Sequence, residues 1–198
     1  MRRCGVNDDW IPGLQVPLTI HDLRQGRKYH NELPYGNKDQ DQDQDHGRHR
    51  ESLRQLLEKF DVQDIFGLVD KHKHFELPHD SHLIGTVGTF GVRPQSLFYL
   101  IRTVPDKTSN PNELCGHKFT YIPGEGLRPY EFHQGPLLGK SKVDPEFFSQ
   151  FINYLYKYNI TSIGLDDFLE TVSKGGDLLE TVSKGGDLLE TVSKGSDL

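Results

Sequence analysis

Alanine is absent from this chain, and sulfur-containing residues are scarce. Among 198 residues there are two cysteines, one methionine and one tryptophan, against 20 glycines. Because alanine is the strongest helix former, any helix here has to be specified by an apolar face rather than by local propensity. The two cysteines, Cys4 and Cys115, are too few and too far apart in the sequence to form a disulfide framework. The scarcity of cysteine favours a reducing compartment, the cytoplasm or the nucleus.

Long apolar runs and clustered positive charge are also missing. No apolar run approaches the ~20 residues of a membrane-spanning helix. Met1, Arg2 and Arg3 are not followed by the apolar stretch of a secretion signal. The net charge is -6 and the pI is about 5.9, whereas surfaces that bind phosphate backbones need clustered lysine and arginine. We therefore expect no signal peptide, no transmembrane segment, no membrane partner and no nucleic-acid partner.

By composition the chain divides into four parts. Residues 1–35 mix prolines with a short apolar alternation and predict an extended N-terminal arm. Residues 36–50 read GNKDQDQDQDHGRHR and predict a solvated, low-complexity linker. Residues 51–164 are long enough for one folded domain with a single core. Residues 165–198 form a tail of three decapeptide repeats.

Two amphipathic helices and several strands are predicted within residues 51–164. The first helix carries an apolar stripe of Leu53, Leu56, Leu57 and Phe60. The second begins at Asp144, which is followed by Pro145 and Glu146, and its buried face comprises Phe147, Phe148, Phe151, Ile152, Leu155 and Tyr156. Apolar segments bounded by glycine and proline predict strands within residues 64–77, 82–91, 96–104, 118–122 and 130–133. The predicted fold class is α+β, an antiparallel sheet of four to five strands packed by the two helices.

The tail repeats with a period of ten residues: FLETVSKGGD, LLETVSKGGD and LLETVSKGSD. Asp167, Asp177 and Asp187 each precede a glutamate by three residues, which is the capping-box spacing, so each unit predicts a turn and a half of helix. Helices of this length are unstable alone, and we expect a weakly structured tail. The alternative is that its leucine and valine faces bind a protein partner or associate with each other.

Residues 70–76 carry the side chains best suited to a metal. On a strand, alternation places Asp70, His72, His74 and Glu76 on one face. Imidazoles and carboxylates are ligands for iron, manganese or zinc, and His79, His82 or His133 could complete the set. The candidate metal ligands are therefore His72, His74, Glu76 and His133, and a divalent metal is the one cofactor considered. The commoner alternative is that this face is the solvent side of the sheet.

Cys115 and His117 offer a second chemistry. A thiolate beside an imidazole is an activated nucleophile, and the two residues would share a face of a strand. No oxyanion hole or third orienting group can be identified, and GxSxG, HExxH, kinase and phosphate-loop motifs are absent. We therefore assign no catalytic residue from the sequence.

The segment FDVQDIFGLVDKHKHFELP, residues 60–78, resembles a recurrent pattern in proteins of filamentous fungi. In that pattern a leucine-rich helix precedes a strand with FG and then a His-x-His-Phe core. The resemblance implies a fungal origin, and because the family has no assigned activity it implies no role for His72 or His74. Lys73, the DQ linker and the repeat tail depart from the pattern.

The sequence therefore favours a small accessory, non-catalytic protein with a ligand- or protein-binding surface. The alternative is a mononuclear metal-binding protein or a metal-dependent enzyme that uses the face of His72, His74 and Glu76.

Overall fold

The structure is a computed structural model that describes residues 10–36, 44–89, 97–135, 143–167, 179–184 and 187–193. For residues 44, 87–89, 97–100, 179–184 and 187–193 it describes the backbone alone. Across these ranges, no helix combines the length and apolar character that crossing a membrane requires.

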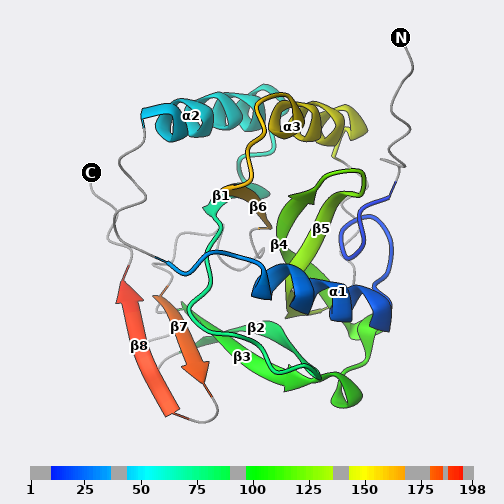
Figure 1. Cartoon of the computed structure of the whole chain (residues 1–198), viewed down its shortest axis with the longest axis vertical. Coiled ribbons are helices and arrows are strands. Elements are labelled where there is room, and N and C mark those ends of the chain that lie inside the picture. The colour runs from blue at the N-terminus through cyan, green and yellow to red at the C-terminus, as the bar shows by residue number, and fades with distance from the viewer. Residues whose placement is uncertain are drawn as a thin grey trace.

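The helices are α1 (Ile20–Asn31), α2 (Gln44–Lys59) and α3 (Pro145–Lys157). The described chain contains α2 and α3 side by side at one end of the molecule and α1 across the strands (Figure 1). The strands are β1 (Phe66–Asp70), β2 (Ser81–Thr89), β3 (Leu97–Pro105), β4 (Leu114–Ile122), β5 (Gly126–Gln134), β6 (Ile163–Asp167), β7 (Leu179–Lys184) and β8 (Asp187–Ser193). Two short 3-10 helices, η2 (Asp106–Thr108) and η3 (Pro111–Glu113), join β3 to β4.

The strands form one mixed sheet in the order β1-β6-β4-β5-β2-β3-β7-β8. Most neighbours are antiparallel, but β2 pairs with β5 and β3 pairs with β7 in parallel. The predicted α+β class is confirmed, and the predicted antiparallel sheet of four to five strands agrees only roughly, because the sheet has more strands and two of its pairings are parallel. The β2–β3 and β4–β5 hairpins are local, but the parallel pairing of Ile84 with Phe132 joins residues 48 positions apart. No local pattern determines which hairpin edges meet.

The two predicted helices cover the largest core. Leu53 and Leu57 of α2 are buried, and Leu56 and Phe60 pack partly buried beside them, which confirms the predicted stripe. In α3 the buried residues are Phe147, Phe148, Phe151, Ile152 and Leu155. Tyr156, predicted to be buried, is 65% exposed because it lies beyond the edge of the apolar stripe. These faces pack on strand residues Phe66, Phe119, Leu127, Ile163 and Leu165.

The predicted extended arm, residues 1–35, instead contains α1, which lies across β5 and β2 (Figure 1). Thr19 begins the helix with a capping box, in which its hydroxyl accepts from the backbone N–H of Asp22 while the Asp22 carboxylate accepts from the Thr19 backbone. Leu23 packs with Leu18, Ile84, Leu114 and Phe132 in a second core cluster. The arm was mispredicted because α1 has few apolar residues, and its buried face includes a glycine and a histidine.

The predicted linker and first strand also need correction. The helix α2 begins at Gln44, inside the predicted linker of residues 36–50, while residues 37–43 lie outside the described residues. The strand predicted within residues 64–77 spans only Phe66–Asp70. The chain then leaves β6, because the N–H of Lys73 donates to the carbonyl of Pro34 at 2.8 Å and that of Gly36 donates to Lys73 at 3.1 Å. These bonds tie Lys73 to the segment that follows α1.

The second and third repeats contribute strands rather than the predicted short helices. In the described part of the tail, β7 pairs in parallel with β3 and antiparallel with β8. Pairing with an existing sheet edge satisfies the backbone of a segment too short to be a stable helix. The first repeat, residues 168–177, lies outside the described residues.

Candidate functional site

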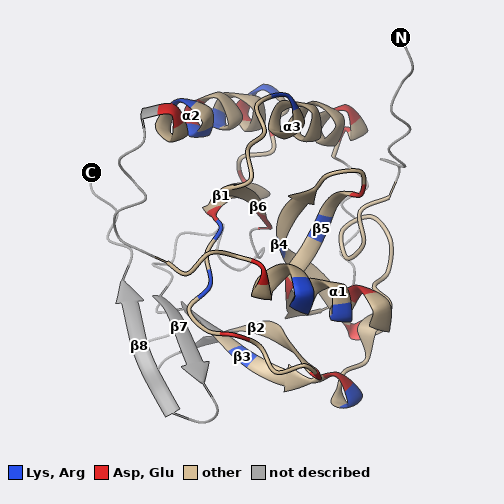
Figure 2. Cartoon of the chain, in the orientation of Figure 1, with Lys and Arg blue, Asp and Glu red and all other residues tan. Residues whose placement is uncertain are grey.

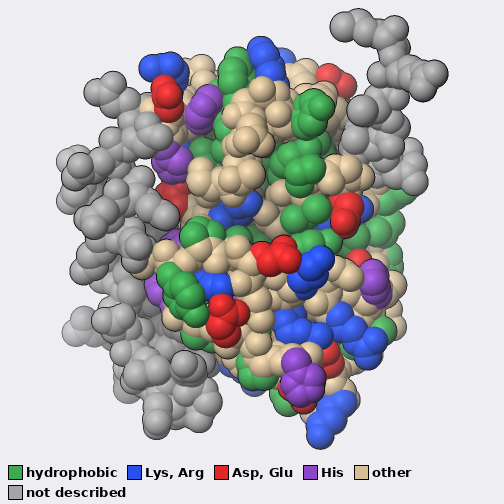
Figure 3. Space-filling model, viewed as in Figure 1, with side chains coloured by type: hydrophobic (Ala, Val, Ile, Leu, Met, Phe, Trp, Pro, Cys, Tyr) green, Lys and Arg blue, Asp and Glu red, His purple; other side chains and the backbone are tan. Residues whose placement is uncertain are grey.

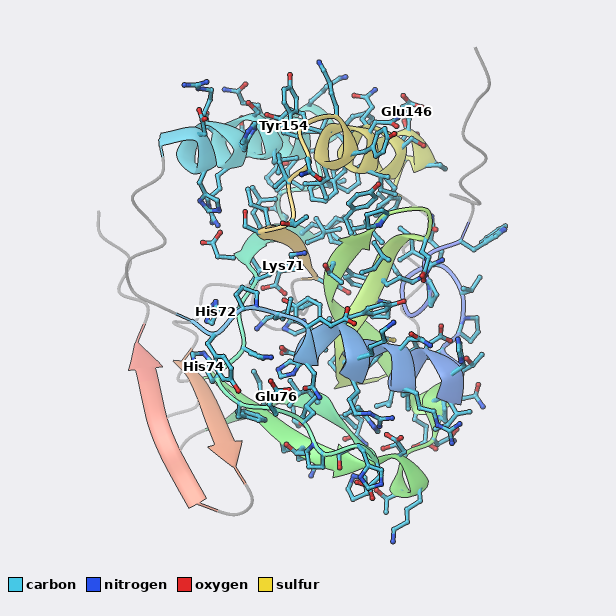
Figure 4. All side chains as sticks on the ribbon, in the orientation of Figure 1. Lys71, His72, His74, Glu76, Glu146 and Tyr154 are labelled. Atoms are coloured by element: carbon cyan, nitrogen blue, oxygen red, sulfur yellow. The ribbon has the colours of Figure 1, made fainter. Side chains whose placement is uncertain are left out.

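His72 and His74 lie side by side on the surface, in the irregular segment that follows β1 (Figure 4). Their Nε2 atoms are 3.2 Å apart, and the two rings are nearly perpendicular at 88°. The Nδ1 of His72 lies 3.0 Å from the carbonyl oxygen of Asp70 and donates its proton there. The two imidazoles therefore lie together on one side of the segment, although the segment is not the strand from which the sequence predicted a shared face.

Lys71 and Lys73 occupy the opposite, buried face of the same segment. The ammonium of Lys71 donates to the Thr120 hydroxyl at 2.5 Å, and burial lowers the pKa of Lys71 to about 8. The ammonium of Lys73 donates to the carbonyl of Asn31 and to the carboxylate of Glu76 at 2.5 Å. Two anchored lysines thus direct the intervening histidine outward.

The other predicted metal ligands do not join the histidine pair. Glu76 pairs with Lys73 and accepts a hydrogen bond from the Tyr35 hydroxyl at 3.3 Å. The hydrogen bond from Lys73 lowers the pKa of Glu76. His133 is buried on β5, opposite Cys115 of β4. Within the described ranges no group of three or more histidine, cysteine or acidic side chains could hold a metal ion, so the predicted four-ligand set is not brought together.

A polar cluster that the sequence did not reveal lies within the central strands. It comprises Cys115, His117 and Lys118 of β4, Glu131 and His133 of β5, and Asp166 of β6, all largely buried. In the register Cys115 is opposite His133, and Lys118 is opposite both Glu131 and Asp166. The ladder is irregular between Gly116 and Lys118, which places His117 in a β-bulge. The register, which is fixed by long-range pairing, is what gathers these residues.

Within this cluster His117 is held as a neutral imidazole. Its Nδ1 donates to the Asp167 carbonyl at 2.9 Å, and its Nε2 lies 3.5 Å from Asp166 and 4.0 Å from Glu131. Burial lowers the pKa of His117 to about 3, although Glu131 opposes the shift. The Cys115 thiol donates to the Gly135 carbonyl at 3.4 Å. Because Cys115 and His117 are only 3% and 6% exposed, the predicted thiol–imidazole pair is closed to solvent in this structure.

An open depression of about 430 Å³ lies between α1 and η2. It is lined by Ile20, Arg24, Arg27, His79, Asp80, Asp106 and Lys107. Figure 2 shows basic residues on α1 and on the loop below it, and Figure 3 shows Lys and Arg side chains gathered over this lower part of the face. Sequence reasoning missed this surface because its residues come from three separate segments.

Arg27 is held in this depression by a chain of polar contacts. Its Nη1 donates to the Asp106 carboxylate at 2.8 Å and to the Ser81 carbonyl at 3.3 Å. The other Asp106 oxygen accepts from Nδ1 of His82 at 2.9 Å. Burial lowers the pKa of His82 despite its bond to Asp106. Burial alone would raise the pKa of Asp106, but the bonds from His82 and Arg27 lower it overall, so this carboxylate stays ionised.

Comparisons with models of protein families, with curated proteins and with solved structures found no match for this chain. The resemblance of residues 60–78 to a fungal family therefore remains a prediction.

Proposed function

We propose that this protein is a binding domain for a small anionic ligand, one that carries a phosphate or carboxylate group, and that the ligand occupies the depression between α1 and η2. The observation that carries the proposal is the fixed position of the Arg27 guanidinium. Asp106 and Ser81 engage only its Nη1, and no described residue accepts a hydrogen bond from Nε or Nη2. A guanidinium with free donors in a set geometry is suited to the paired oxygens of an anion.

Two exposed cationic side chains near Arg27 favour the same ligand class, and the exposed Asp80 is the acidic residue of the lining that opposes it. Arg24, one turn earlier on α1, and Lys107 of η2 are both exposed and line the depression. The Asp106 carboxylate is committed to Arg27 and His82, so it does not repel a ligand as an isolated carboxylate would. Because Arg27 is already ordered by this ion pair, a ligand loses less side-chain entropy on binding. A binding role agrees with the accessory function that the sequence favours.

The test is a titration with inorganic phosphate and, separately, with acetate, followed by calorimetry and by NMR shifts of backbone amides. We expect saturable binding that shifts residues of α1 and η2, and a Lys107→Gln variant that binds at least fivefold more weakly. The matched control is Lys28→Gln, because Lys28 is also exposed, pairs with Glu32 and does not line the depression. Equal affinity in both variants, or shifts located elsewhere, would overturn the proposal.

The metal-dependent alternative, a mononuclear centre of His72, His74 and Glu76, loses a ligand because Glu76 is committed to Lys73 and Tyr35. The partner-binding alternative for the repeats remains a prediction. The β7–β8 pairing favours a role as an extension of the sheet over a free helical ligand.

A further inference from the structure

We infer that His72 and His74 form a two-imidazole site for one divalent transition-metal ion, of which copper binds most tightly. This site is separate from the depression beside α1 and does not depend on the function proposed for it. The inference begins from the 3.2 Å between the two Nε2 atoms. Two imidazole nitrogens that each lie 2.0–2.1 Å from one ion are about 2.9 Å apart at a square-planar ion such as Cu²⁺ and about 3.3 Å apart at a tetrahedral one such as Zn²⁺. The pair is therefore already spaced as neighbouring ligands of a single ion.

The hydrogen bond on the far side of His72 selects the correct tautomer. Because Nδ1 of His72 donates to the Asp70 carbonyl, its Nε2 carries a lone pair. Without metal, that lone pair accepts the proton on Nε2 of His74. When an ion binds, it takes the place of this shared proton, and His74 carries its proton on Nδ1 instead. No proton is gained or lost in the exchange.

The backbone beneath the pair is fixed from both sides. Lys71 is anchored on Thr120 and Lys73 on Asn31 and Glu76, so His72 is held between two inward-pointing residues. The segment around Gly36 pairs with Lys73 through two backbone hydrogen bonds. An added Cβ at Gly36 would lie 2.8 Å from Cδ2 of the His72 ring, so the absence of a side chain there leaves room for the ring. Such preorganisation lowers the entropic cost of binding.

The ligand type indicates which ions bind. Neutral imidazoles suit copper, nickel and zinc, whereas magnesium and calcium prefer oxygen ligands. With two protein ligands the remaining positions are filled by water, as in sites that keep open coordination positions. Affinity for nitrogen ligands rises from nickel to copper and falls again at zinc.

The test uses the untagged full chain, titrated with Cu²⁺ and with Zn²⁺ by calorimetry, with electron paramagnetic resonance to report nitrogen ligation of Cu²⁺. We expect one tight Cu²⁺ site per chain, with weaker Zn²⁺ binding. His72→Ala and His74→Ala should each weaken Cu²⁺ binding at least tenfold. The control is His21→Ala, because His21 is also an exposed histidine but lies on α1, away from this segment.

A second variant tests the geometry without removing a ligand. Gly36→Ala keeps both imidazoles but crowds the His72 ring, and we expect it to weaken Cu²⁺ binding several-fold. Urea denaturation checks that each variant is folded, which we expect because both imidazoles are exposed. Binding that is unchanged in the His72→Ala/His74→Ala double variant, or equal competition by Mg²⁺, would overturn the inference. Phosphate binding should be unaffected by these changes.

Discussion

Lys71 is a charged residue whose ammonium is buried against Thr120 of β4. Its partner is the neutral hydroxyl of Thr120, which stabilises the charge less than a carboxylate would. Burial therefore shifts the pKa of Lys71 from the ordinary value of 10.5 to about 8. The side chain stays buried because Gly164 and Thr120, on neighbouring strands, pack around it.

This shift gives a pH dependence with a definite sign. Between pH 8 and 10.5 the unfolded chain keeps the proton that folded Lys71 has lost, so stability rises with pH by up to about 1.4 kcal/mol per pH unit from this group. Lys71→Met should remove this rise and be at least as stable as the wild type at pH 7. Urea denaturation at pH 7, 8, 9 and 10 measures both effects.

The exposed residue Lys28 provides the matched control, since Lys28→Met should retain the full rise between pH 8 and 10. Parallel stability profiles for the wild type and Lys71→Met would show that Lys71 does not carry the pH dependence.

At the scale of elements, two helical glycines have opposite surroundings. Gly26 lies on the buried face of α1, where an added Cβ would be 2.7 Å from the Phe132 ring and 2.9 Å from the Pro129 carbonyl. Gly47 lies in α2 with nothing within 4 Å of an added Cβ. The first glycine therefore permits the close approach of α1 to β5, whereas the second only weakens its helix.

We predict opposite signs for the same substitution at these two positions. Gly47→Ala should stabilise the protein by about 0.5–1 kcal/mol through helix propensity. Gly26→Ala should destabilise it by about 1–3 kcal/mol, because overpacking against β5 exceeds the gain in propensity. Thermal and urea denaturation of both variants give the comparison. Stabilisation by Gly26→Ala would mean that α1 can move away from β5 without loss.

Residues 51–164 supply most of the core, but the whole molecule also requires the segment before them. The described buried apolar residues run from Ile11 to Leu165, and none of them belongs to β7 or β8, whose side chains the structure does not describe. In the described residues β7 contributes to the fold through its backbone pairing with the edge of β3. An uncovered strand edge promotes association between chains.

Removal of residues 168–198 should therefore leave the six strands β1 to β6 and the three helices folded. We expect the free energy of unfolding to change by no more than about 1 kcal/mol. The shortened chain should associate more strongly as its concentration rises, because β3 becomes an edge. Urea denaturation and light scattering measure the two effects. A shortened chain that is unfolded, or that remains monomeric where the full chain does, would contradict this account of the repeats.

The local patterns that the sequence carries determined α2, α3 and the outward direction of His72 and His74. An apolar stripe with a period of 3.6 residues, or alternation with a period of two, is a property of residues close together in the sequence. Such a pattern can be recognised without knowing which other segments it packs against. The same holds for the strand segments that became β2, β3, β4 and β5. In α1, the helix was missed although the spacing of Thr19 and Asp22 indicated its start, because its packing face contains Gly26 and His30.

Tertiary structure alone decided the rest, since each feature depends on residues far apart in the sequence. The polar cluster exists because the register places His133 opposite Cys115 and because β6 brings Asp166 beside Lys118. Glu76 does not join the histidine pair because its carboxylate pairs with Lys73, which is anchored on the carbonyl of Asn31. The depression beside α1 required Arg27 to meet Asp106 from 79 residues away. The direction in which a side chain points depends on its neighbours in the sequence. Which residues it then contacts depends on chain packing and electrostatics over the whole molecule.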